Sequence, residues 1–123
     1  MIVRDAMSKI AAGTNMSLSY SSGTITLNSK GITVTNVSGA TPVITAAENT
    51  RYICGEVTSL SFTPCASGIC DVRFTSGSTV TVLTLPNTVK MPDWFDASVL
   101  EANTIYEINI LDGVYGVVTT WAV

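Results

Sequence analysis

Apolar and polar residues alternate along most of this chain, most clearly in residues 103–123. Asp112-Gly113 separates two runs that carry a large apolar residue at every second position, and this dipeptide suits the two positive φ angles of a type I′ turn. A two-residue turn would fix the strand register and place Ile110 opposite Tyr115. The side chains predicted to share the buried face of this hairpin are those of Tyr106, Ile108, Ile110, Tyr115 and Val117.

The same two-residue period predicts further strands upstream of the hairpin. Short candidates fall within residues 16–37 and 43–63, where Ser and Thr alternate with apolar residues. Residues 69–86 are predicted to form a second hairpin around a Ser-Gly-Ser turn, and residues 87–103 lack alternation. We therefore expect a mainly β protein with an antiparallel β domain over residues 15–123, either a β sandwich or a trimeric β prism.

A different period marks residues 1–14. Val3, Met7 and Ile10 recur at spacings of three and four, and Gly13 offers a stop, which predicts a short N-terminal helix. A single apolar stripe of this length is not stable alone in water. The helix should therefore pack against the domain or against copies of itself, and we assign Val3, Met7 and Ile10 to assembly or anchoring.

Composition narrows the class of partner. Hydrophobic residues make up 46% of the chain and charged residues 12%, with a net charge of −3. The six basic residues are scattered, so the chain lacks the electrostatic footprint of a nucleic-acid-binding protein. We also expect no membrane insertion, since no apolar run reaches the length of a membrane span, and charged residues interrupt the N-terminus where a signal peptide is apolar. Assembly in the cytosol is the expectation.

The sequence contains no histidine, so the usual general base, the common metal ligand and the Ser-His and Cys-His nucleophile pairs are absent. We expect no enzymatic activity, no metal and no cofactor. Three cysteines, Cys54, Cys65 and Cys70, argue against a complete disulfide framework because their number is odd. Cys65 and Cys70 bracket a short turn in which a bond is geometrically feasible. Small buried thiols are the favoured interpretation of all three.

One constellation suggests a ligand. Asp93 and Asp96 flank Trp94 and Phe95, and carboxylates beside an aromatic platform suit a sugar-binding surface, with Tyr20 as a further stacking ring. The favoured interpretation is structural: the two rings plug the open end of the sheet and the two acids cap a turn. A glycan-binding module is the alternative function.

Four segments in a fixed order carry a resemblance to a known family: NTRYICGEVTSLSFTP, DVRFTSGSTVTVLTLP, MPDWF and LEANTIYEINILDGVYGVVTTW. They resemble the C-terminal β domain of small virion proteins of tailed bacteriophages, which occurs in fibres, tail appendages and head decorations. The resemblance covers residues 49–123 and leaves residues 1–48 unassigned. The segments that match as framework positions, without a catalytic residue among them, are Phe74–Gly77, Leu83–Pro86 and Tyr106–Gly113.

The resemblance implies a non-enzymatic virion protein that is homotrimeric, projects from the particle and can touch the host surface. Its expected partners are two further copies of the chain, a capsid or tail protein and, in the alternative function, a glycan of the host surface. The chain lacks the long shaft of a full tail fibre, so a head fibre or decoration stays open beside a tail-borne role.

Overall fold

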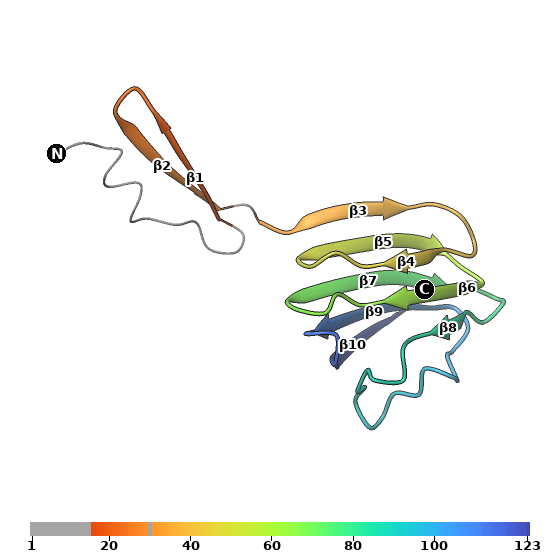
Figure 1. Cartoon of the computed structure of the whole chain (residues 1–123). Coiled ribbons are helices and arrows are strands. Elements are labelled where there is room, and N and C mark those ends of the chain that lie inside the picture. The colour runs from red at the N-terminus through yellow and green to blue at the C-terminus, as the bar shows by residue number, and fades with distance from the viewer. Residues whose placement is uncertain (1–15, 30) are drawn as a thin grey trace. The chain divides into compact units, whose positions relative to one another are not determined.

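The computed structural model describes residues 16–29 and 31–123, which belong to two compact units, Met1–Ile32 and Thr33–Val123 (Figure 1). These described residues form strands, turns and loops. They contain no helix, and therefore none that is long and apolar enough to cross a membrane. The predicted helix over residues 1–14, with Val3, Met7 and Ile10, lies outside the described residues. The prediction of a mainly β protein is confirmed.

The described part of the first unit is an antiparallel hairpin of β1 (Met16–Ser21) and β2 (Thr24–Ser29). Ser22 and Gly23 form its turn, and both have positive φ angles, 50° and 84°. Glycine adopts this backbone region without steric cost, which explains why the Ser-Gly pair marks a turn in the sequence.

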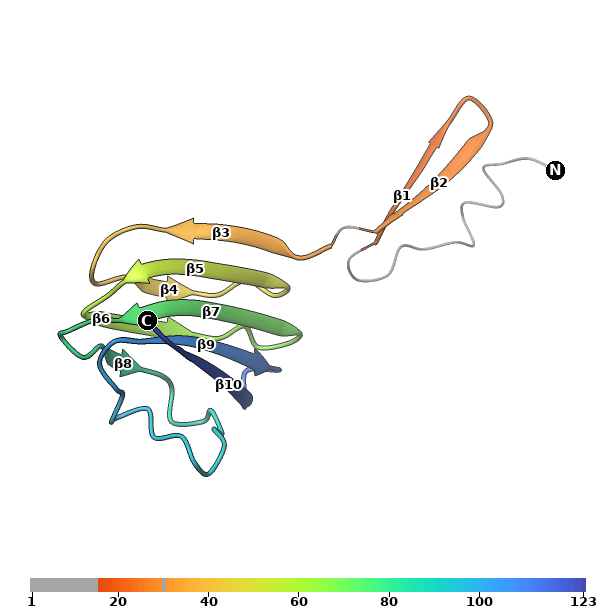
Figure 2. The same ribbon diagram turned by 180° about the vertical axis from the view of Figure 1, so that it is seen from behind.

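The second unit contains two sheets, and from β3 to β9 the chain passes from one sheet to the other after each strand, whereas β9 and β10 are neighbours in the same sheet. A five-stranded sheet has the order β10-β9-β7-β5-β3, and a three-stranded sheet has the order β4-β6-β8 (Figures 1 and 2). Both sheets are open. The strands are β3 (Thr33–Val37), β4 (Val43–Thr45), β5 (Thr50–Glu56), β6 (Ser59–Thr63), β7 (Ile69–Ser76), β8 (Val82–Thr84), β9 (Thr104–Leu111) and β10 (Tyr115–Ala122).

This alternation between sheets makes most of the pairing parallel, which corrects the predicted antiparallel domain. β3, β5 and β7 pair in parallel, as do β4, β6 and β8. The chain from β3 to β8 therefore forms a short coil, and each turn of this coil adds one strand to each sheet. Only β7–β9 and β9–β10 are antiparallel in this unit. The predicted hairpin over residues 69–86 is wrong because β7 and β8 lie in different sheets. Alternation reports which face of a strand is buried and carries no information on strand direction.

The core lies between the two sheets. β7 turns Cys70, Val72 and Phe74 inward, and each is fully buried. β6 contributes Leu60 and Phe62 from the opposite sheet. Burial of a side chain of this size stabilises the fold by about 1.5–3 kcal/mol. These inward positions recur at every second residue, as the sequence predicted for the individual strands.

The terminal hairpin forms at the predicted turn but in a different register. Asp112 and Gly113 have φ angles of 53° and 69°, and the Val114 N–H donates to the Leu111 carbonyl at 3.1 Å, as in a type I′ turn. The ladder, however, begins with Leu111 opposite Tyr115, so Val114 is an extra residue between turn and strand.

This one-residue slip overturns the predicted common face. Ile108 and Ile110 are fully buried and Tyr106 nearly so, whereas Tyr115 is 57% exposed and Val117 62% exposed on the opposite side of the sheet. The five side chains are therefore split between two faces. In a β ladder a shift of one residue sends every side chain to the other face.

Gly116 gives the physical reason for the register. The Gly116 N–H donates to the Lys90 carbonyl at 2.9 Å, and the Lys90 N–H donates to the Val114 carbonyl at 2.6 Å. The segment at Lys90 and Met91 therefore covers the start of β10, and a Cβ atom on residue 116 would collide with the Met91 sulfur. A side chain at position 116 would therefore require the Met91 side chain to move.

Candidate binding site

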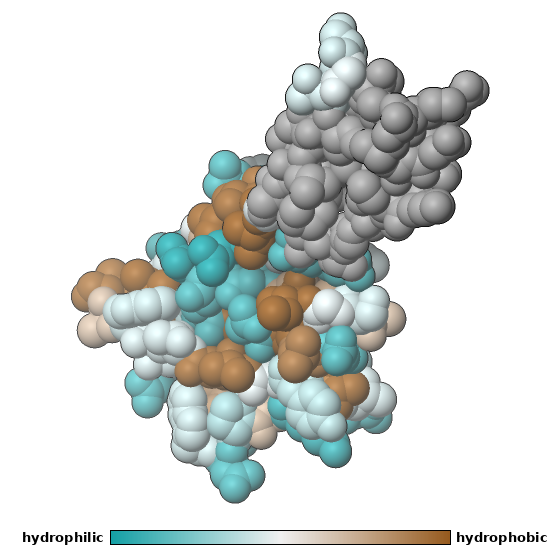
Figure 3. Space-filling view, turned by 90° about the vertical axis from the view of Figure 1, so that its left-hand side faces the viewer, coloured by the Kyte–Doolittle hydropathy of each residue, from teal (hydrophilic) through white to brown (hydrophobic). Residues whose placement is uncertain are grey.

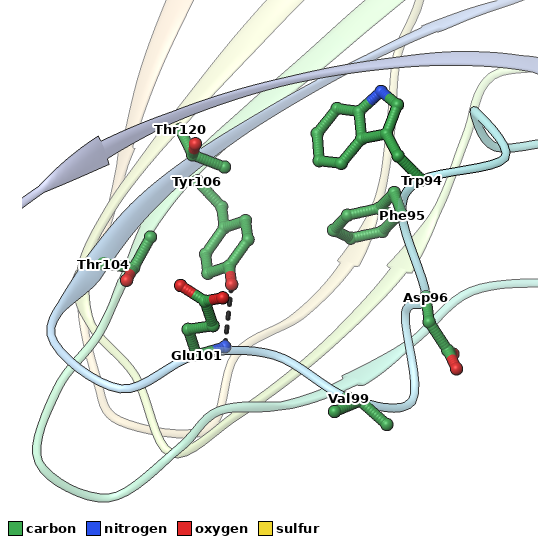
Figure 4. A pocket seen from close by; sticks show the side chains of 8 residues that line it. All are labelled: Trp94, Phe95, Asp96, Val99, Glu101, Thr104, Tyr106 and Thr120. Atoms are coloured by element: carbon green, nitrogen blue, oxygen red, sulfur yellow. Dashed lines mark hydrogen bonds between the residues drawn. The ribbon is translucent and has the colours of Figure 1, made fainter.

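The loop between β8 and β9 holds the aromatic and acidic residues that the sequence singled out. One of its turns is closed by the Phe95 N–H, which donates to the Pro92 carbonyl at 3.0 Å, and the next by the Val99 N–H, which donates to the Asp96 carbonyl at 3.1 Å. These are isolated turns, and no helix follows Asp96 in this loop. The loop rims a hollow of about 140 Å³ lined by Trp94, Phe95, Asp96, Val99, Glu101, Thr104, Tyr106 and Thr120 (Figure 4).

A series of aromatic rings leads from solvent to the core at this hollow. Trp94 is 65% exposed and meets Phe95 edge-on, with ring centroids 5.8 Å apart. Phe95 meets Tyr106 at 6.1 Å, and Tyr106 stacks on the buried Phe74 at 5.5 Å. Phe95 packs against the core, in line with its predicted role as a plug, whereas Trp94 presents its ring to solvent. An exposed indole with a fixed edge is a stacking surface for an apolar or sugar face.

The polar groups of the hollow come mainly from residues that the sequence did not single out. The Glu101 N–H donates to the Tyr106 hydroxyl at 2.8 Å, which holds the buried ring in place (Figure 4). Thr104 donates its hydroxyl to the Ala102 carbonyl at 3.0 Å. Thr120 joins the site because β10 places it opposite Tyr106. From the sequence, Thr120 could have been identified only through the register of the terminal hairpin, and the predicted register was shifted by one residue.

Asp93 and Asp96, the two acids that the sequence singled out, differ in their relation to the hollow. Asp96 accepts hydrogen bonds from the Ser98 hydroxyl at 2.6 Å and the Ser98 N–H at 2.9 Å, and these bonds lower the pKa of its carboxyl. It therefore caps a turn, as predicted, and its carboxylate points away from the ring pair (Figure 4). Asp93 is exposed and is not among the residues that line the hollow. The carboxylate at the hollow itself belongs to Glu101.

A second feature lies on the outer face of the five-stranded sheet, which we define as the side that turns away from β4, β6 and β8. Arg51 pairs with Asp71 at 3.1 Å and with Glu107 at 3.5 Å, and Arg73 pairs with Glu107 at 3.1 Å. Asn109 donates to Asp71 at 3.4 Å. Glu107 comes from β9, and the sequence gave no sign that it belongs to this network.

Asp71 is 2% exposed although it belongs to the outer face. Burial raises the pKa of its carboxyl, and the neighbouring Glu107 carboxylate raises it further, while Arg51 and Asn109 act in the opposite direction. A carboxylate that is withdrawn from water in this way needs its partners, because an unpaired buried charge is costly.

Large apolar side chains surround these charges on the outer face. Arg73 lies over the Trp121 ring, 5.7 Å from its centroid, and borders a small hollow with Ile105 and Trp121. Strand register places the other members on the same face. The exposed apolar residues of this face are Val34, Ile69, Leu111, Tyr115, Val117 and Trp121. Aromatic residues and arginine in such a setting are typical of interfaces between proteins.

In the part of the chain that the structure describes, no group of three or more His, Cys, Asp or Glu side chains is placed to hold a metal ion. No family, curated protein or solved structure matches this chain.

Proposed function

We propose that this chain is a non-enzymatic structural protein of a tailed-bacteriophage virion, a homotrimeric surface appendage of the head or tail whose copies pack through the outer face of the five-stranded sheet. The resemblance of residues 49–123 supports the virion role. The observation that carries the packing is the outer face itself, where exposed Val117 and Trp121 lie beside a balanced set of charges.

The charges of this face favour contact with another copy. Two arginines and two carboxylates sum to zero, so equal faces do not repel each other over a distance. Leu111, Tyr115, Val117 and Trp121 extend along β9 and β10 to the edge of the sheet and supply apolar area. Closed rings of identical subunits are the usual outcome when such surfaces meet. A prism of three chains would cover this face, with Val3, Met7 and Ile10 attaching the trimer to a capsid or tail protein.

Light scattering coupled to size exclusion tests the trimer. The intact chain should elute at three times its mass of 12.9 kDa, and Val117→Lys should shift it to the monomer. Val43→Lys is the matched control, because Val43 is also an exposed strand valine, 80% accessible, but belongs to β4. A monomeric wild type at micromolar concentration, or equal behaviour of the two variants, contradicts packing through the outer face.

Glycan binding at the hollow is the second candidate, because Trp94 presents an exposed ring beside the Glu101 carboxylate and the Thr104 and Thr120 hydroxyls. Ligand pockets for larger molecules usually enclose about 300–1,000 Å³, so this hollow suits one sugar edge stacked on the indole. On an array of host-surface polysaccharides, Trp94→Ala should abolish the signal and the neighbouring Asp93→Asn should keep it. Absence of wild-type signal would leave the scaffold role alone.

A further inference from the structure

The turn between β6 and β7 brings two cysteines together. Cys65 follows β6, and Cys70 lies at the start of β7, five residues later. The Cys65 N–H donates to the Cys70 sulfur at 3.4 Å, and the Cys70 thiol faces the Ile110 carbonyl at 3.9 Å. Both thiols are free and buried. The Cys65 backbone therefore touches the Cys70 sulfur, and this contact is the geometric basis for a bond between the two cysteines.

The turn between β6 and β7 also contacts the turn of the terminal hairpin. The Gly68 N–H donates to the Asp112 carboxylate at 2.9 Å, and the Asp112 N–H donates to the Gly68 carbonyl at 2.8 Å. The Ser67 hydroxyl donates at 3.0 Å to the carboxylate of Glu48, which lies in the turn between β4 and β5. A Cβ atom on Gly113 would lie 2.9 Å from the Cys65 carbonyl oxygen, so the two turns are in close contact.

The three turns lie side by side at one end of the strands (Figures 1 and 2). The space-filling view from that side shows hydrophilic patches between apolar ones (Figure 3). Residues 65–70 therefore link the turn between β6 and β7 to the terminal hairpin, and within this segment Cys65 keeps a small contact with solvent, 8% of its area.

We propose that Cys65 and Cys70 are a reversible disulfide site, closed by exchange with an oxidised small-molecule disulfide of the glutathione class. The Cys65 thiolate attacks one sulfur of the oxidant, which forms a mixed disulfide and releases one small thiol. The Cys70 thiolate then displaces the second small thiol and forms the Cys65–Cys70 bond. Two protein thiols are oxidised, one disulfide is reduced, and the two thiol protons end on the two released small thiols.

The environments of the two thiols set the order of these steps. Cys65 is 8% exposed at the surface turn, whereas Cys70 is fully buried, so Cys65 is the group that the oxidant meets first. Burial raises the pKa of the Cys70 thiol to about 12. Closure by Cys70 should therefore be the slow step at neutral pH, and it should accelerate as the pH rises because the thiolate is the nucleophile.

The Cys65–Cys70 bond would stabilise the contact between the β6–β7 turn and the terminal hairpin. A cross-link over a short loop limits the freedom of the unfolded chain, so the melting temperature should rise by several degrees. Amide exchange at Gly68 and Asp112 should slow, because the hydrogen bonds between these residues open less often when the turn is closed.

Peptide mapping of the full chain after treatment with oxidised glutathione tests the site. Cleavage after Arg and Glu separates Tyr52–Glu56, which carries Cys54, from Val57–Arg73, which carries Cys65 and Cys70. The mass of Val57–Arg73 should fall by about 2 Da, since two hydrogens leave, and Tyr52–Glu56 should keep one thiol that reacts with iodoacetamide. Reduced glutathione in excess should restore both thiols.

Cysteine variants identify the partners. Cys54→Ser should still form the bond, whereas Cys65→Ser should lose both the mass change and the rise in melting temperature. Circular dichroism of each variant shows that it is folded. Three free thiols in the treated wild type, glutathione that stays attached to Cys65, or a bond that includes Cys54 would each overturn the proposal.

Discussion

The two faces of the five-stranded sheet differ although the same strands form both. The inner face of β7 and β9 carries Phe74, Ile108 and Ile110, each fully buried against the other sheet. The outer face carries a buried carboxylate at Asp71, paired charges, and exposed rings at Tyr115 and Trp121. The inner face is therefore complete within one chain, and the outer face combines features of a core and of a surface. Such a mixture is typical of a subunit interface.

The largest expected effect is on the inner face. Phe74→Ala removes a buried ring that stacks on Tyr106 at 5.5 Å and should lower the free energy of unfolding by about 3–5 kcal/mol, measured by urea denaturation. Trp121→Ala on the outer face is the comparison, because this ring is 44% exposed. In the monomer its loss should cost about 1 kcal/mol or less.

Protein concentration sharpens this comparison. If the outer face is an interface, the cost of Trp121→Ala should grow as the protein concentration rises, since association stabilises only the folded chain. The cost of Phe74→Ala should stay the same. Equal dependence of both variants on concentration would contradict the division of roles between the two faces.

A smaller effect is expected at the edge strand. Gly116→Ala places a methyl group against the Met91 sulfur, and movement of the Met91 side chain should lower the free energy of unfolding by about 1 kcal/mol. Gly55→Ala is the matched control, because a Cβ atom there meets no atom within 4 Å. Its effect should stay within about 0.5 kcal/mol. Equal costs for the two glycine variants would show that Met91 does not determine the register.

The smallest expected effect is on the way in which the free energy of unfolding depends on pH, through Asp71. The pKa of Asp71 is raised above 3.8 in the folded chain, so its protonated form is favoured by folding. Its contribution to stability is present below pH 3.8 and is lost as the pH rises through the raised pKa.

Asp71→Asn tests this sign. The stability of the variant relative to wild type should rise across that window, by about 1.4 kcal/mol for each unit by which the pKa is raised. Urea denaturation of both proteins from pH 3 to pH 7 measures it. A fall in this relative stability over the same pH range would show that Arg51 lowers the pKa of Asp71 by more than burial and the Glu107 charge raise it.

Much of the local structure was predictable from neighbouring residues. The alternation in β9 predicted the burial of Tyr106, Ile108 and Ile110, and Asp112-Gly113 predicted the turn. The cap formed by Asp96 also followed from local pattern. Each of these features depends on a short segment, so the period of the side chains or the chemistry of a turn is sufficient to indicate it.

The binding hollow was predictable only in part. Trp94 and Phe95 stand out in the sequence because an aromatic pair flanked by acids is unusual, and both line the hollow. Glu101 and Thr120 do not stand out. Thr120 reaches the hollow through the pairing of β10 with β9, and the position of β10 depends on the fit of Gly116 beneath Met91.

The sequence by itself determined the strand content, the inward positions of the central strands and the terminal turn, because these depend on side-chain period and on the backbone freedom of single residues. Only the tertiary structure decided the parallel direction of pairing, the division into two sheets and the register of β10. These depend on contacts between segments that are far apart in the chain, such as Lys90 with Val114 and Arg73 with Glu107. A period of two is the same for either strand direction, and one extra residue after a turn reverses both faces.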